Sequence, residues 1–573
     1  MFSNLKFFIE KRRIKAFFLL LGTLAIGLLE VLSIALVFPV LNFALEGQGV
    51  GGSAPSGMQN ILNFYGHVAE YFGTQEIVVA SISLIIVAIL TYLMTLFFTW
   101  FQLVFSTNLV LDTKEKIFRK LMLLDFNFFV GTKNSSILHV LFKSTESLSS
   151  YTESFIKALG ELIKILFFLV LMLYISLIGT LLIVFIGIFY LVVSKLTINK
   201  IITPTSSALR ELEKDQLHLI SEFVNYVKEI RIYIQQETWL NLYIKKASQF
   251  AKNLRLNQFG ASILAALPSM IIIIAVGIVG LLIESLSLSL AFASAFATIF
   301  LAGQRINGSL SIFLSQVTAI NIHHPNIIAI FSLLNLPENK VITEKLLKLP
   351  KWNKLTFKKV SFSYFSSKEK IIKNVDFTIK KNSTVALIGD SGSGKSTLID
   401  LLLKVYSVND GGIYFDESPL EAISNKDFWS RVGFVGQNPA IIDGSLRDNI
   451  LFGRNFTENE IISASQKSGV ISFLDDLDDG YNSQIMENGS NLSGGQKQSI
   501  MIARALISNP EILILDEITS ALDPISEDRI NELIKTLHRK TTILIITHNI
   551  LMTKYADDVY QIKDRNLVRI TKD

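Results

Sequence analysis

The chain has 573 residues, of which 50% are hydrophobic and 18% are charged, and its mean hydropathy is +0.44. This composition is unusual for a soluble protein of this length and is typical of a chain that lies partly in lipid. The net charge of +5 is modest and is explained by the positive flanks of membrane helices, so nucleic acid is not an expected partner. The absence of cysteine excludes disulfides, thiolate zinc sites and iron–sulfur clusters.

Long apolar stretches occupy the first 320 residues. They are Ala16–Leu45, Ile77–Phe105, Ile165–Ser194 and Ala261–Ile320. A membrane-spanning helix needs ~20 apolar residues. The third stretch is broken at Ser176–Gly179 and the fourth at Glu284–Ser289. Reading each broken stretch as a helical hairpin predicts six membrane crossings.

The lysines and arginines are grouped in a way that tests this count. None occurs in residues 16–113 or 165–194, whereas residues 114–164 and 195–255 contain many. The positive-inside rule places both of these blocks, the N-terminus and everything after residue 320 in the cytoplasm. We therefore expect a multi-pass membrane protein with a cytoplasmic N-terminus. The alternative is that these are buried helices of a soluble protein.

The remaining sequence divides the chain into domains. The two basic blocks have helical periodicity, which predicts membrane helices that continue into the cytoplasm. Residues 335–354 are polar and rich in lysine, as expected of a linker. We therefore predict a transmembrane domain at 1–334, a linker at 335–354 and a second, cytoplasmic domain at 355–573.

A glycine-rich loop in the second domain predicts an ATP site. The buried-strand pattern Val385–Gly389 leads into Gly-Asp-Ser-Gly-Ser-Gly-Lys-Ser-Thr, and the helical run Leu398–Val405 follows. This strand, loop and helix give the full context of a P-loop, whose backbone N–H groups and helix N-terminus bind phosphates. The predicted nucleotide-binding residues are Gly389, Ser391, Gly392, Ser393, Gly394, Lys395, Ser396 and Thr397. Lys395 would contact the β- and γ-phosphates, and Ser396 would bind Mg²⁺.

Two carboxylates end a second apolar strand. Residues 511–517 read Glu-Ile-Leu-Ile-Leu-Asp-Glu. We assign Asp516 to the Mg²⁺ shell and Glu517 to general-base positioning of the attacking water. Leu492-Ser493-Gly494-Gly495-Gln496 then precedes the helical segment Lys497–Ile507, so a hydroxyl and glycine N–H groups at a helix start form a second anion site.

The order of these motifs resembles that of ABC exporter half-transporters. The resemblance implies an α-helical membrane domain with six transmembrane helices, joined to an α/β P-loop ABC ATPase domain. In that family the signature motif, here residues 492–496, caps the γ-phosphate held by the P-loop of another subunit. Two copies are therefore needed, and a homodimer is expected. A heterodimer with one silent site stays open as the alternative.

Further family positions occur in order. Tyr364 resembles the aromatic residue that stacks on adenine, although a strand aromatic of the core is the alternative. Gln437 resembles the residue that joins Mg²⁺ to the transmembrane domain, and His548 resembles the switch histidine that contacts the γ-phosphate. Residues 520–523 (Ser-Ala-Leu-Asp) resemble the loop at the dimer interface. We therefore take Glu517, His548 and Lys395 as the catalytic residues and ATP and Mg²⁺ as the cofactors.

Some positions depart from the family pattern. Ser499 stands where an arginine commonly follows the signature, and residues from Glu487 on form a reduced version of the Glu-rich segment before it. Short helices near Asp125–Thr132 and Val227–Trp239 are candidates for transmitting motion to the membrane domain, with plain turns as the alternative.

Two charges in the apolar helices bear on the substrate. Arg305 is the only lysine or arginine between residues 256 and 339, and Glu30 lies midway along the first apolar stretch. A charge inside the membrane is costly and is a functional hypothesis by default, although the two could simply pair or cap a helix. Residues 28–39, with Arg305, resemble the bacterial flippase for lipid-linked oligosaccharides of N-glycosylation.

That resemblance implies ATP-driven export or flipping of a lipid-linked saccharide whose pyrophosphate would suit an arginine. The expected partners are a second copy of the chain, the lipid bilayer and a lipid-linked or amphipathic substrate. The alternatives are an exporter of peptides, lipids or drugs and, more remotely, an ATP-gated channel or regulator.

Overall fold

A computed structural model gives the fold of the chain. It describes residues 12–37, 39–40, 43, 56–175, 177–286, 292–338, 347–364, 369–390, 392–518, 524–548, 550–563 and 565–570. The chain divides into two compact units. The first comprises Met1–Met122 and Thr132–Pro337, and the second comprises Leu123–Gly131 and Glu338–Asp573.

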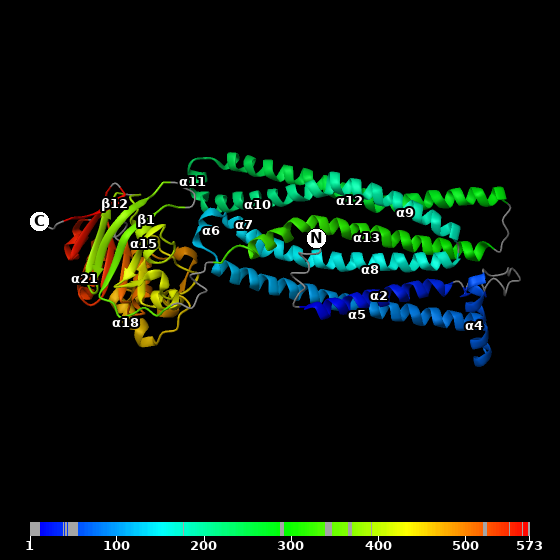
Figure 1. Cartoon of the computed structure of the whole chain (residues 1–573), viewed down its shortest axis with the longest axis horizontal. Coiled ribbons are helices and arrows are strands. Elements are labelled where there is room, and N and C mark those ends of the chain that lie inside the picture. The colour runs from blue at the N-terminus through cyan, green and yellow to red at the C-terminus, as the bar shows by residue number, and fades with distance from the viewer. Residues whose placement is uncertain are drawn as a thin grey trace. The chain divides into compact units, whose positions relative to one another are not determined.

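The first unit is helical, and its long helices run side by side (Figure 1). The helices at the predicted crossings are α2 (Arg13–Ala35), α5 (Glu76–Leu123), α8 (Thr145–Ile175), α9 (Leu177–Thr197), α12 (Gln236–Leu286) and α13 (Phe292–Leu334). The other helices are α4 (Ser56–Phe72), α7 (Asn134–His139), α10 (Thr203–Asn225) and α11 (Val227–Ile232). At 48 and 51 residues, α5 and α12 are far longer than the ~20 residues that cross a bilayer.

The two expected helix breaks are confirmed. Helix α8 ends at Ile175 and α9 begins at Leu177, while α12 ends at Leu286 and α13 begins at Phe292. The connecting residues themselves lie outside the described ones. In the described residues, three helical segments are long and apolar enough to cross a membrane, namely Arg13–Ala35, Glu76–Leu123 and Gly303–Leu334.

Close helix packing holds this unit together. Helix α8 packs against both α13 and α2. Ile306 of α13 lies in one buried cluster with Phe168 of α8 and Ile34 of α2. Gly27 of α2 faces α8, since a Cβ built on it would lie in ordinary contact with Phe167 at 3.4 Å and with Lys164 at 3.5 Å. Small residues let membrane helices approach in this way.

The second unit is an α/β domain with two main sheets. A six-stranded sheet has the order β12-β11-β3-β10-β9-β6 and is parallel except for its β12 edge. A four-stranded antiparallel sheet has the order β2-β1-β4-β5, and β7 and β8 form a short pair. The strands are β1 (Lys354–Phe362), β2 (Ile372–Lys380), β3 (Thr384–Gly389), β4 (Asp410–Phe415), β5 (Ser418–Pro419), β6 (Val432–Val435), β7 (Gly444–Ser445), β8 (Gln484–Ile485), β9 (Ile512–Asp516), β10 (Thr542–Ile546), β11 (Asp558–Lys563) and β12 (Asn566–Ile570).

Helices surround these sheets (Figure 1). They are α6 (Phe126–Gly131), α15 (Lys395–Leu402), α16 (Asn425–Ser430), α17 (Leu446–Leu451), α18 (Glu458–Ser468), α19 (Ile471–Leu474), α20 (Gly494–Leu506) and α21 (Pro524–Leu537). Strands β9 and β10 are buried along their whole length, which explains why they read as unbroken apolar runs.

Helix α6 comes from the N-terminal half of the sequence but belongs to the second unit. Its Phe126 ring packs edge-on against Tyr406, with the ring centroids 5.8 Å apart. Of the two segments proposed to transmit motion, the first therefore packs on the ATPase domain. The second corresponds to α11 and belongs to the first unit.

Candidate functional site

The carboxyl ends of three neighbouring parallel strands build the candidate ATP site. Gly389 ends β3, Asp516 ends β9, and His548 follows β10. In the register, Ile546 lies opposite both Leu387 and Asp516, so the three strand ends stand level. Ligands of open α/β sheets bind at this edge.

The P-loop adopts backbone conformations that its glycines allow. Gly392 has φ +77° and Gly394, the N-cap residue of α15, has φ +107°. A side chain at either position would be strained, so the local sequence explains this turn. Ser391 of the predicted set lies outside the described residues.

Lys395 begins α15 and is almost fully buried, with 4% of its side chain exposed. Its Nζ donates to the carbonyl oxygens of Gly389 and Asp390, each at 2.8 Å, and lies 3.9 Å from Glu517 Oε1. Burial lowers the pKa of Lys395, and the nearby carboxylates partly offset this. The amine therefore lies inside the loop, where a phosphate would replace the carbonyls as its partner.

Asp516 and Ser396 fit a Mg²⁺ ion. The Ser396 hydroxyl acts to lower the pKa of the Asp516 carboxyl. Among the described residues, the buried Asp516 Oδ1 has no hydrogen-bond partner. Burial raises the pKa of Asp516, and the charge of Glu517 raises it further. A buried carboxylate oxygen beside a hydroxyl suits a hard cation that also takes phosphate oxygens as ligands.

Glu517 is the centre of the arrangement. His548 Nε2 lies 2.6 Å from its Oε1, and Gln437 Nε2 donates to its Oε2 at 2.7 Å. The backbone of Glu517 has φ +49°, in the left-handed region that non-glycine residues seldom adopt. Such strain is found at functional sites, where the surrounding structure maintains it. The structure thus brings together Lys395, Gln437, Glu517 and His548.

Tyr364 lies beside the P-loop helix. Its hydroxyl is 3.0 Å from Thr397 Oγ1, and its ring packs edge-on against Phe362 and Tyr406, at centroid distances of 5.1 and 5.3 Å. The side chain thus joins an aromatic cluster, and stacking on adenine stays a prediction.

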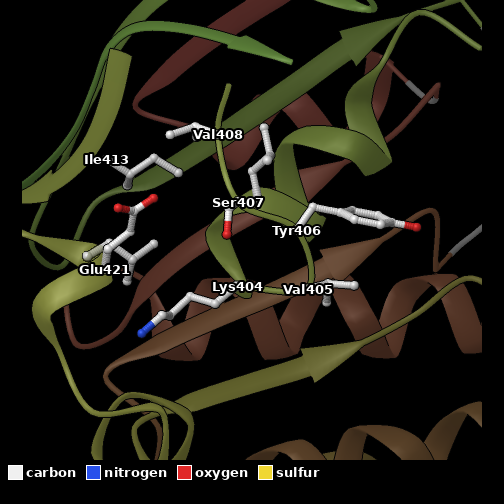
Figure 2. A pocket seen from close by; sticks show the side chains of 9 residues that line it. Lys404, Val405, Tyr406, Ser407, Val408, Ile413 and Glu421 are labelled. Atoms are coloured by element: carbon white, nitrogen blue, oxygen red, sulfur yellow. The ribbon is translucent and has the colours of Figure 1, made fainter. Parts of the chain in front are cut away.

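A pocket lies next to this cluster (Figure 2). Its lining includes Lys404 and Glu421, and the Lys404 and Tyr406 side chains extend in opposite directions. Lys404 Nζ donates to the Ile423 carbonyl at 2.7 Å, and burial lowers its pKa to about 8. None of the predicted site residues lines this pocket, so we do not assign it to the ATP site.

The signature residues lie at the start of α20. Ser493 is its N-cap, and its hydroxyl accepts from the Gln496 N–H at 3.2 Å, while Gln496 Oε1 accepts from the Ser493 N–H at 2.8 Å. This capping box fixes the start of the helix, and Ser493 and Gly494 are exposed to solvent there. No hydrogen bond between described residues joins this segment to the P-loop. Within one chain the structure therefore does not bring the two together.

The charges of the membrane domain have different surroundings. Glu30 Oε1 lies 2.8 Å from Lys164 Nζ, which is also 3.1 Å from Glu161. Arg305 is exposed on α13, and in the described part of the chain no hydrogen bond or ion pair engages it. The possible pairing of Glu30 with Arg305 is thus not seen. The spacing of three residues on one helix predicts the pair of Lys164 with Glu161, but no local pattern indicates that Lys164 also pairs with Glu30.

Comparison with known proteins identifies the family. Residues 20–321 match the family model of the ABC transporter transmembrane region, and residues 372–520 match the family model named ABC transporter. The chain belongs to the ABC transporters, as a half-transporter with one membrane domain and one ATP-binding domain.

Individual relatives of the chain are also ABC transporters. The chain is 30% identical over 480 residues to ATP-dependent lipid A-core flippase 2 of Colwellia psychrerythraea, covering 81% of this chain and 80% of that protein. It is 28% identical over 469 residues to the lipid A-core flippase of Francisella tularensis, covering 79% and 75%. ABC transporter B family member 13 of Arabidopsis thaliana is 39% identical over 212 residues, or 37% of this chain and only 17% of that protein.

Among solved structures, a bacterial Atm1-family ABC exporter with ATP bound matches with a TM-score of 0.80 and 20% identity. The match covers 98% of this chain and 94% of that one. The predicted fold class is confirmed, and so is the prediction of an exporter that couples ATP hydrolysis to transport across a membrane.

Proposed function

We propose that two copies of this chain form a homodimer in the bacterial inner membrane. This homodimer would use ATP to flip a lipid-linked, phosphate- or pyrophosphate-bearing saccharide outward. The ATPase part rests on one observation, the meeting of Lys395, Asp516, Glu517 and His548 at the carboxyl ends of β3, β9 and β10. The N-terminus and the ATPase domain would be cytoplasmic, as the lysine and arginine distribution indicates.

Each residue of the site has a proposed role. Lys395 would exchange the carbonyls of Gly389 and Asp390 for phosphate oxygens. Ser396 and Asp516 would hold Mg²⁺, with Gln437 nearby, and the ion would neutralise charge on the phosphates. Glu517 would orient and deprotonate the attacking water, and His548 would keep its carboxylate in place.

The signature supports the dimer. Ser493 and Gly494 are exposed at the N-terminus of α20, and no described hydrogen bond joins them to the P-loop of the same chain. The N–H groups at a helix N-terminus favour anions. Because this helix start is not bonded to the P-loop of its own chain, it suits the phosphate bound by the P-loop of a second chain. A preparation that hydrolyses ATP at the normal rate while strictly monomeric would contradict this part of the proposal.

Arg305 supports a phosphate-bearing substrate. It is exposed on a helix that is apolar enough to cross the membrane, and Glu30 is already paired with Lys164. An arginine inside a membrane helix that no described residue pairs is a candidate for the substrate path, and its planar fork matches phosphate oxygens. The flippase relatives favour a lipid. They equally support a second candidate, the export of a lipid that bears no pyrophosphate.

Transport in proteoliposomes tests the substrate. ATP hydrolysis and flipping would be measured with a polyprenyl-pyrophosphate saccharide, with lipid A and with an apolar drug. We expect the first to stimulate hydrolysis, and Arg305→Ala to lose both this stimulation and transport. Lys195→Ala, which removes an exposed lysine near the end of α9, is the matched control. Stimulation by lipid A alone would favour the second candidate, and unchanged transport by Arg305→Ala would remove the phosphate argument.

A further inference from the structure

The loop that carries Gln437 follows β6, the edge strand of the six-stranded sheet. In the described part of the chain, residues 437–443 make no backbone–backbone hydrogen bond, and residues 437–440 are exposed. The Gln437 side chain nevertheless has a defined place, since its Nε2 donates to Glu517 Oε2 at 2.7 Å. The position of the loop therefore depends on the neighbouring elements to which it is tied.

Arg504, in the last turn of α20, is bonded to this loop. Its Nη1 donates to the Ala440 carbonyl oxygen and its Nε to the Asn449 carbonyl oxygen, each at 2.8 Å. The guanidinium also lies over the Phe452 ring, 4.2 Å from the ring centroid. Burial lowers the pKa of Arg504 to about 10, so the group stays charged at neutral pH and its hydrogen bonds are charge-assisted.

Asn449 of α17 extends the same anchor along the loop. Its side chain is fully buried, and it both donates to the Ile442 carbonyl oxygen and accepts from the Ile442 N–H, each at 2.9 Å. Between these contacts, Ile441 lies in a buried cluster that includes Ile500 of α20. The loop is thus fixed from Ala440 onward, three residues after the glutamine.

The segment between the anchor and the glutamine is short and stiff. Only Asn438 and Pro439 separate Gln437 from Ala440. The proline ring fixes one backbone angle of Pro439, and its bulk restricts the residue before it. A displacement of the Ala440 carbonyl is therefore passed on to the Gln437 side chain.

We propose that Arg504 is a positioning residue for ATP hydrolysis, which holds Gln437 at Glu517 and the Mg²⁺ site through the Ala440 carbonyl. The inference rests on the proposed roles of Gln437 and Glu517. A lysine at position 504 would keep the charge but could not hold two carbonyl oxygens in fixed directions, because only the guanidinium presents several N–H groups in a rigid fork. Arg504→Lys therefore separates the geometry from the charge.

The test measures ATP hydrolysis by the full-length protein in lipid nanodiscs against the concentration of Mg²⁺. Arg504→Lys is expected to lower kcat and to raise the half-activating Mg²⁺ concentration, each by roughly tenfold, as for residues that orient a metal ligand. Binding of a fluorescent ATP analogue without Mg²⁺ should not change, because the P-loop is untouched. Arg454→Lys is the matched control and should leave both values unchanged, since Arg454 donates to the carbonyl oxygens of residues 450, 451 and 504 and not to the loop.

Two further variants test the route through the loop. Pro439→Gly frees the backbone between Gln437 and Ala440 at an exposed position and leaves Arg504 in place, so it should reproduce the Mg²⁺ effect. Adding Arg504→Lys to Gln437→Ala should cause no further loss of rate, because both substitutions act through one side chain.

The outcomes separate the positioning role from the proposed site. If Gln437→Ala hydrolyses ATP like the wild type with the same Mg²⁺ dependence, the role of Gln437 is wrong and the inference falls with it. If Gln437→Ala is impaired while Arg504→Lys is not, or if their effects multiply in the double variant, the positioning role alone is overturned. If thermal melting shows that Arg504→Lys is unfolded, Pro439→Gly decides, and an unchanged Mg²⁺ dependence in that variant overturns the inference.

Discussion

Replacing Glu517 by glutamine tests the chemistry of the ATP site most directly. The carboxylate accepts from two groups, with His548 Nε2 2.6 Å from Oε1 and Gln437 Nε2 2.7 Å from Oε2. An amide has a single acceptor oxygen, so in Glu517→Gln one of these two donors faces an NH₂ group. The side chain also loses its ability to take a proton from water.

The size of the effect follows from these losses. General-base catalysis is worth about 10²–10⁴ in rate, so hydrolysis should fall by that factor. Nucleotide binding depends on Lys395 and the P-loop backbone, which the substitution does not touch, so binding should persist. The dimer should then accumulate with nucleotide bound.

Steady-state hydrolysis with Mg²⁺ and binding of a fluorescent ATP analogue would be measured on the same preparation. Glu417→Gln, which neutralises an exposed carboxylate of the same domain, is the control. Loss of a general base should lower the rate by a factor of about 10²–10⁴. If Glu517→Gln hydrolyses ATP within about threefold of the wild-type rate, the assignment of Glu517 as the base is refuted.

Two further predictions concern ion networks. Burial acts to raise the pKa of Glu511, but bonds from Lys381 and Arg431 outweigh it and hold that pKa below its usual range. Its contribution to stability is therefore complete above the unfolded-state pKa of about 4.3 and is lost as the pH falls through the lower folded-state value. Melting of the whole protein from pH 6 down to about pH 2 should show this loss, and Glu511→Gln should abolish it; equal pH profiles for both would contradict it. In the membrane domain, Lys164→Gln leaves two carboxylates facing each other, so adding Glu30→Gln should recover about 0.5–3 kcal/mol. Additive melting shifts in nanodiscs would disprove this coupling.

Much of the fold could be predicted because its signals are local. The P-loop needs Gly392 and Gly394 at positive φ directly after a strand, and both the spacing and the residue types are visible in the sequence. The helix breaks near residues 176 and 287–291 were visible as interruptions in apolar runs. The paired carboxylates at the end of β9 were recognisable because a buried strand precedes them.

Contacts between distant segments could not be read in this way. The partner of Glu30 is Lys164, 134 residues further along the chain, and only the packing of α2 against α8 brings the two together. Tyr364 lies just after β1, against Tyr406 and Thr397, and its place in the sequence did not reveal these neighbours.

The sequence by itself determined the class of the protein, because hydrophobic length, charge distribution and phosphate-binding loops are properties of contiguous residues. Only the tertiary structure decided which side chains share a site. Gln437 and His548 meet on Glu517 because they follow β6 and β10, the two strands on either side of β9. Such contacts depend on how the helices and sheets pack. The local sequence around a residue does not indicate which side chain, 30 or 100 residues away, it will contact.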